Sequence, residues 1–115
     1  MIAPTCLFCR ILQGEVGASV VAESDTAFAF RDIDPQAPSH VLVIPRRHVA
    51  NLAELAREAP SEALDLIGLA AEVADTEGLD KGYRLVANTG SDAHQTVYHA
   101  HLHVLGGRPM GWPPG

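Results

Sequence analysis

The chain has 115 residues, 47% hydrophobic and 19% charged, which fits one compact domain with a sizeable core and excludes a disordered segment. Its formal net charge of −6 repels long polyanions, so nucleic acid is not expected as a partner, although a local pocket can still bind a small phosphate. No apolar run is long enough to cross a bilayer and residues 1–10 lack the regions of a signal peptide, so we expect a cytoplasmic protein with no membrane partner.

The first motif along the chain is a Cys-x-x-Cys pair, Cys6 and Cys9. A disulfide between them would close a very small loop and restrain the unfolded chain little. Metal binding or redox chemistry explains the spacing better, and free buried thiols are a further alternative. Redox chemistry is the weaker hypothesis, because we do not expect the pair to stand at the start of a helix that follows a strand.

The next segments predict short strands. Apolar runs at 19–22 and 26–30 flank a polar turn and indicate a β-hairpin. Residues 32–39 contain two prolines, which predicts a surface loop rather than a central strand. The run 40–44 (HVLVI) then indicates a buried strand that ends at Pro45.

Two helices are predicted next, a short one over 50–57 and a long one over 61–77 that Gly78 closes. The apolar residues of the long helix form two stripes, Leu64, Ile67, Ala71 and Ala74 on one and Leu66, Leu69, Ala70 and Val73 on the other. One stripe can cover a sheet, and the second suggests a partner chain. The alternative is a helix that is well buried within a small domain.

Residues 83–88 and 97–105 predict two further strands, separated by a polar loop at 89–92. Several strands with one long and one short helix between them indicate an α+β domain over residues 1–115, whose sheet is mainly antiparallel.

The last predicted strand carries three alternating histidines, His99, His101 and His103. Because successive side chains of a strand point to opposite faces, we expect all three imidazoles on one face, with neighbours about 6.5 Å apart. Three convergent imidazoles are the ligand set of a catalytic zinc ion. They also suit nucleophilic attack on phosphorus by one ring that its neighbours orient. The spacing alone does not decide between these chemistries.

The histidine strand resembles the signature of the histidine triad (HIT) family, three histidines each followed by an apolar residue. The resemblance covers nearly the whole chain, through residues 32–40, 43–45, 88–92, 95–98 and 105–108. The ending at 112–115 is similar to that of the Hint branch, the purine nucleoside phosphoramidases.

This resemblance implies a nucleotide hydrolase in which His101 displaces the leaving group from the α-phosphorus of an adenosine 5′-phosphoramidate. A covalent nucleotidyl-histidine forms, and water hydrolyses it to AMP without a cofactor. The unperturbed pKa of histidine, about 6.5, leaves much of the ring neutral and nucleophilic. The resemblance assigns His103 to a phosphoryl oxygen, His40 to the orientation of His101, and His99 to the surroundings of the nucleophile.

The family pattern also implies the remaining nucleotide contacts. Thr96 and Asn88 match residues near the phosphate, and Asp32 matches the acceptor for the ribose hydroxyls. The residues that resemble the apolar purine pocket are Leu7, Phe8, Ile11, Phe30 and Ile33. The tail 106–115, with Trp112, resembles one that reaches the partner subunit in a homodimer whose sheet extends across the interface. His94 stands where the Hint branch usually has glycine.

Bacterial members with the cysteine pair bind structural zinc through two additional histidines, and the matching residues are His48 and His99. The resemblance therefore implies a possible closed Cys₂His₂ site with Cys6 and Cys9. Two alternatives to the hydrolase remain. The first is a non-catalytic nucleotide-binding or interaction protein with structural zinc. The second is a zinc hydrolase that uses His99, His101 and His103 as metal ligands.

Overall fold

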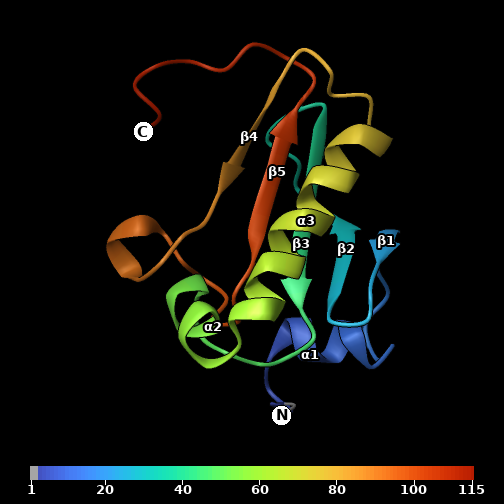
Figure 1. Cartoon of the computed structure of the whole chain (residues 1–115), viewed down its shortest axis with the longest axis vertical. Coiled ribbons are helices and arrows are strands. Elements are labelled where there is room, and N and C mark those ends of the chain that lie inside the picture. Colours follow the sequence, from blue (N-terminus) through green and yellow to red (C-terminus); the bar gives the residue numbers. More distant parts are fainter. Residues whose placement is uncertain (1–2) are drawn as a thin grey trace.

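A five-stranded sheet forms the centre of the computed structural model, which describes residues 3–115, so the first two residues of the expected domain lie outside it (Figure 1). All neighbouring strands are antiparallel, in the order β1-β2-β3-β5-β4. The strands are β1 (Val20–Glu23), β2 (Ala27–Arg31), β3 (Ser39–Pro45), β4 (Tyr83–Val86) and β5 (Leu102–Gly106). The helices are α1 (Leu7–Leu12), α2 (Leu52–Glu58) and α3 (Pro60–Thr76), with a 3₁₀ turn at Ser91–Ala93. The predicted α+β class is confirmed.

The two faces of the sheet carry different side chains because of the strand period of two. In β2, Ala27 and Ala29 belong to the core under α3, whereas Phe28 and Phe30 belong to a second core with α1. Alanines let α3 lie close to the sheet, and the phenylalanines fill the space beside the shorter helix. Every residue of β3 is buried, which explains its unbroken apolar run.

Helix α3 covers one face of the sheet, in front of it in Figure 1. The stripe that contains Leu66 and Val73 is buried, together with Ala74 of the other stripe. Leu64 and Ile67 point to solvent, with 70% and 46% of their surface exposed. One stripe therefore covers the sheet, as the sequence predicts, and the partner for the other stays a prediction.

The predicted start of the last strand is wrong, because β5 begins at Leu102 rather than at residue 97. The backbone N–H of Ala100 donates to the carbonyl of Val49 at 2.8 Å, and the Gln95 amide donates to the carbonyls of Ala50 and Val97. These bonds tie the segment before β5 to the loop that leads into α2, so it does not join the sheet.

The sequence prediction also omitted α1, and Pro45 is the last residue of β3 rather than the residue after it. Cys6 caps α1, where its Sγ accepts a hydrogen bond from the N–H of Cys9 at 3.4 Å. The cysteine pair thus stands at the start of a helix, but α1 precedes β1 and follows no described strand, so the expectation that the pair does not begin a helix after a strand is confirmed. Within residues 3–115, no helix has the length and apolar character that a bilayer span requires.

The two faces of α3 give a matched pair of substitutions. Leu66→Ala removes a fully buried side chain and should lower the free energy of unfolding by about 2–5 kcal/mol. Leu64→Ala removes an exposed one and should change it by less than about 0.5 kcal/mol. Urea denaturation at constant protein concentration measures both values. Equal losses would contradict the placement of the helix.

Candidate active site

A cavity of about 260 Å³ lies on the α1 face of the sheet. All five residues of the expected purine pocket line it, namely Leu7, Phe8, Ile11, Phe30 and Ile33. Asp32, Thr96, His101 and His103 line the same cavity. The fold thus brings together residues from α1, from β2 and the loop after it, and from β5 and the segment that leads into it.

His101 has a defined proton position. Its Nδ1 lies 2.8 Å from the backbone carbonyl oxygen of His99, and because a carbonyl only accepts, Nδ1 must carry the hydrogen. In the neutral ring, Nε2 then keeps its lone pair. Burial lowers the pKa of His101, so the ring is neutral at physiological pH. Phe8 packs edge-on against this ring, with 5.1 Å between centroids.

A chain of hydrogen bonds also sets the proton positions of His40 and His103. The N–H of Gln36 donates to His40 Nδ1 at 3.0 Å, so the hydrogen of the neutral His40 ring is on Nε2. That Nε2–H donates to His103 Nδ1 at 2.9 Å. In neutral His103 the hydrogen therefore lies on Nε2, where it can donate to a ligand in the cavity.

Asp32 lies beside this histidine pair, with its Oδ2 3.4 Å from His40 Nε2. Burial is the main cause that lowers the pKa of His103 to about 4, and the neighbouring His101 and His40 lower it further. The Asp32 carboxylate acts in the opposite direction on the pKa of His40, His101 and His103. Asp34 raises the pKa of His40 as well, so the site combines neutral rings with two nearby acidic side chains.

The expectation of one common face is confirmed, because Phe8 of α1 packs edge-on against the rings of both His99 and His101. His99 does not, however, line the cavity that His101 and His103 share. Its Nε2–H donates to the carbonyl of Pro45 at 2.8 Å, and its Nδ1 lies 3.4 Å from Cys6 Sγ. Ala100 and Leu102 belong to the core under α3, so the side chains already alternate between the two faces before β5 begins at Leu102. What His99 gives to the cavity is its backbone carbonyl, which orients His101.

Cys6, Cys9, His48 and His99 form a compact cluster, in which one ligand atom from each lies within 4.8 Å of the others. His48 Nδ1 is 3.3 Å from Cys9 Sγ and 3.2 Å from His99 Nδ1. The bond from His99 Nε2–H to Pro45 leaves the Nδ1 lone pair for a ligand. Two sulfur and two nitrogen donors that converge in this way fit a tetrahedral zinc ion.

A second convergent group, Asp32, His40 and His103, is better described as part of the hydrogen-bond chain. A metal ion there would need a lone pair on His40 Nε2, which carries the hydrogen while Nδ1 accepts from Gln36. Within residues 3–115, neither convergent group contains His101. The geometry therefore does not supply the three-histidine metal site that the sequence left open.

Other expected site residues lie outside the cavity wall. The Asn88 amide donates to the carbonyl of Ala93 at 2.7 Å and closes the loop before the site. Trp112 is 84% exposed on the C-terminal tail, which a bond of 2.7 Å from Arg84 to the carbonyl of Gly111 anchors. His94 is exposed and adopts a left-handed backbone, with φ 63°, which glycine adopts more easily.

The sequence analysis missed several residues of the cavity, among them Val16, Leu42 and Val97. A signal for Leu42 was present, because it stands two residues after His40 in the same strand and so on the same face. Val16 and Val97 lie in irregular segments, where no periodicity indicates direction.

Comparisons with known proteins agree with this geometry. A family model described as HIT domain matches residues 13–110. A 14 kDa zinc-binding protein of Zea mays is 47% identical over 98% of this chain and 89% of its own length. The crystal structure of a HIT family hydrolase from Legionella pneumophila superposes with a TM-score of 0.91 at 49% identity, over 96% of this chain and all of that one. A histidine triad nucleotide-binding protein from Candida albicans superposes with a TM-score of 0.81 at 31% identity, over 95% and 83% of the two chains.

The lowered pKa of His103, about 4, predicts a pH dependence of stability. An unfolded histidine takes up a proton near pH 6.5, whereas folded His103 resists protonation until about pH 4. The contribution of neutral His103 to the free energy of unfolding should be complete above pH 6.5 and should decrease as the pH falls toward 4. Between pH 7 and pH 5, the free energy of unfolding measured with urea should therefore decrease less for His103→Asn than for the wild type. An equal loss in both proteins would contradict this assignment.

Proposed function

The chain belongs to the HIT domain family, and we propose that it is a hydrolase that cleaves adenosine 5′-phosphoramidates, or related AMP-X linkages, to AMP. The observation that carries the proposal is the position of the His101 proton. Its Nδ1–H is held by the carbonyl of His99, so the Nε2 lone pair is available to a substrate. The structural similarity to proteins described as a HIT family hydrolase and a nucleotide-binding protein supports the same class.

In the proposed reaction, His101 Nε2 attacks the α-phosphorus and forms a P–N bond as the bond to the leaving amine breaks. The amine takes up a proton from solvent as it departs, and the intermediate is an adenylyl group on His101; the water that attacks in the second step returns a proton to solvent. Water then attacks the phosphorus, AMP leaves, and the imidazole recovers its lone pair. Each step inverts the phosphorus, so the two steps together retain its configuration. A neutral ring at physiological pH suits this role, because a protonated one has no lone pair to donate.

The other residues in and beside the cavity bind and orient the substrate in this proposal. His103 Nε2–H donates to a phosphoryl oxygen, and His40 holds His103 in the required tautomer. The carboxylate of Asp32 accepts from the ribose hydroxyls, and the apolar wall around Phe8 and Phe30 receives the purine. Thr96 offers its hydroxyl to the phosphate or the leaving amine, and Asn88 acts on the phosphate side through the loop that it closes.

Mass spectrometry of a rapidly quenched reaction with adenosine 5′-phosphoramidate tests the nucleophile. We expect an AMP adduct on the peptide that contains His101. A His101→Gly variant should still bind AMP, as measured by calorimetry, but it should form no adduct. Its turnover should fall by at least about a thousandfold, because removal of a nucleophile leaves only binding and electrostatic effects.

Full turnover by His101→Gly, or an adduct on another residue, would contradict the proposed mechanism. AMP binding with no hydrolysis by the wild type, across phosphoramidates, aminoacyl adenylates and dinucleoside polyphosphates, would favour the alternative of a nucleotide-binding or interaction protein.

We also propose that Cys6, Cys9, His48 and His99 hold a structural zinc ion, which the convergence of their ligand atoms and the name of the maize relative support. When bound, zinc would supply a structural cross-link between these four residues, and the reaction at His101 would not use it. The four residues join the start of α1 to the segments after β3 and before β5. The ion would thus hold the residue whose carbonyl orients His101.

Zinc at a free concentration one hundred times its Kd should stabilise the protein by about 2.7 kcal/mol, and a chelator should remove that gain. Native mass spectrometry should show one zinc ion per chain. Cys9→Ser should bind no zinc, and its melting temperature should not respond to the chelator. If neither zinc nor the chelator changes the melting temperature of the wild type, the proposed zinc site is refuted.

A homodimer with a continuous sheet is the third part of the proposal. β4 is an edge strand that pairs on one side with β5 and with no other described strand. Its Tyr83 and Leu85 are exposed apolar side chains. Pairing of two β4 edges would cover them and would place the tail with Trp112 near a partner.

A further inference from the structure

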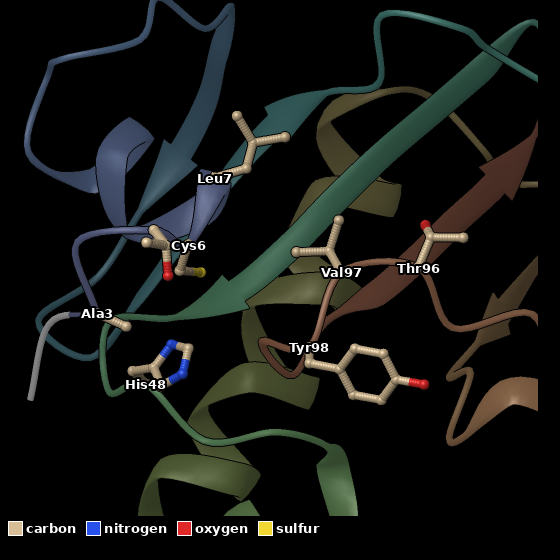
Figure 2. Close-up of a pocket in the computed structure, with 8 residues that line it drawn as sticks. Ala3, Cys6, Leu7, His48, Thr96, Val97 and Tyr98 are labelled. Atoms are coloured by element: carbon tan, nitrogen blue, oxygen red, sulfur yellow. The ribbon is translucent and has the colours of Figure 1, made fainter.

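The cavity in Figure 2 belongs to the two sites already described. Leu7 and Thr96 also line the proposed nucleotide cavity, and Cys6 and His48 belong to the Cys/His cluster. Both sites include residues at or in α1. A polar cluster that neither site contains lies on the other face of the sheet, at the C-terminal end of α3.

Glu77, which caps the C-terminal end of α3, joins two strands through its carboxylate. Its Oε1 accepts hydrogen bonds from the guanidinium of Arg31 at 2.6 Å and from the hydroxyl of Ser39 at 2.8 Å. Its Oε2 accepts a second bond from Arg31 at 2.9 Å. Arg31 is the last residue of β2 and Ser39 is the first of β3. The strand period of two places both side chains on the face that packs under α3.

The stability of the helix does not explain an acidic residue at this position. A negative charge at the C-terminal end of a helix is unfavourable, and the last turn of α3 contains no basic residue to offset it. The side chain of Glu77 is only 12% exposed. The hydrogen bond from Arg31 lowers the pKa of Glu77, so the carboxylate is ionised at physiological pH. Its partners on the two strands therefore hold this charge in place.

The two strand partners of Glu77 each precede a residue of the proposed nucleotide site. Asp32 follows Arg31, and His40 follows Ser39. The N–H of Asp32 donates to the carbonyl of His40 at 3.0 Å, so the two strands meet directly behind the site. The carboxylate of Glu77 thus joins the strands on one face, and Asp32 and His40 stand at the same level beside the cavity.

The loop between these strands depends on its two ends, because residues 33–36 are exposed. Within the loop, the N–H of Asp34 donates to Asp32 Oδ1 at 2.8 Å, and the N–H of Gln36 donates to His40 Nδ1. Arg108 adds a bond of 2.9 Å to the carbonyl of Gln36. A shift of one strand end against the other would therefore move Asp32 relative to the cavity.

We propose that Glu77 is a positioning residue for the nucleotide. By holding Arg31 and Ser39 together on the α3 face, it keeps the Asp32 carboxylate where it can accept hydrogen bonds from the ribose. This inference rests on the proposed function, in which Asp32 binds the ribose hydroxyls. It gives the end of α3, on the far side of the sheet, a part in the selection of ribonucleotides.

Selectivity for the ribose tests this role without requiring hydrolysis. Titration calorimetry gives the Kd of the protein for AMP and for 2′,3′-dideoxy-AMP, which lacks both ribose hydroxyls. The wild type should bind AMP about tenfold more tightly, as expected for hydrogen bonds to a charged group. Glu77→Gln keeps the size of the side chain but presents an amide to Arg31. It should reduce this preference to about threefold or less, because a displaced Asp32 loses the ribose contact.

Glu62→Gln is a matched control at the opposite end of α3. Glu62 pairs with Arg47 through two bonds of 3.1 and 2.8 Å, and its side chain is 20% exposed, so this variant also breaks a two-bond ion pair of the helix. The control should keep the tenfold preference for AMP. Its melting temperature shows how much of the effect of Glu77→Gln is a general loss of stability.

Arg31→Lys supplies a second variant, which keeps the positive charge but cannot form the two-bond contact with Glu77. It should reduce the preference for AMP by a similar factor. Because Glu77 acts through Arg31, the double variant should lose no more of the preference than the more affected single variant. Losses that multiply in the double variant would contradict action through Arg31.

The possible failures are distinguishable. If the wild type binds AMP and 2′,3′-dideoxy-AMP equally, the ribose contact of Asp32 and the role of Glu77 are both wrong. If the wild type prefers AMP and Glu77→Gln keeps that preference, or Glu62→Gln loses it equally, the inference is refuted and the nucleotide site stands. A wild type that binds AMP but hydrolyses no phosphoramidate refutes the proposed reaction, while the ratio of Kd values still decides the role of Glu77.

Discussion

The hydrogen bond from His101 Nδ1–H to the backbone carbonyl of His99 is the interaction on which the rest of the site depends. It fixes the tautomer of the proposed nucleophile, and its acceptor is a main-chain atom that cannot change its own protonation. The ring of the same His99 lies in the cluster with Cys6 and Cys9. One residue thus links the proposed nucleophile to the proposed structural zinc site, which explains how a metal ion outside the cavity can support the reaction without taking part in it.

Backbone atoms set the other tautomers as well. The carbonyl of Pro45 accepts from His99, and the N–H of Gln36 donates to His40. Both come from the ends of β3 or the loop before it, so the register of β3 in the sheet determines where the protons of the histidines lie. Burial then keeps the rings neutral, because a charged imidazole loses its hydration in this environment. The fold therefore supplies neutral rings of defined tautomer, and the cavity beside them supplies the space for a substrate.

The sequence predicted most of the fold, because β1, β2, β3, α2 and α3 have regular periodicity and clear turn residues. It missed α1, which is only six residues long and is capped by a cysteine, a residue that is not a usual capping signal. It also extended β5 backward, because the bond from Ala100 to Val49 is a tertiary contact that no local pattern reveals. Alternation correctly predicted one common face for the histidines, but it could not show that the His99 ring lies among the cysteines rather than in the cavity. The resemblance to the family supplied most of the residues of the cavity, but the proton positions required coordinates.

The most direct measurement of the central claim is the protonation state of each His101 ring nitrogen. Two-bond ¹H–¹⁵N correlation spectra of histidine-labelled protein at pH 7 distinguish a protonated ring nitrogen from a bare one. We expect a hydrogen on His101 Nδ1 and a bare Nε2. A hydrogen on Nε2 with a bare Nδ1, or a doubly protonated ring at that pH, would contradict it.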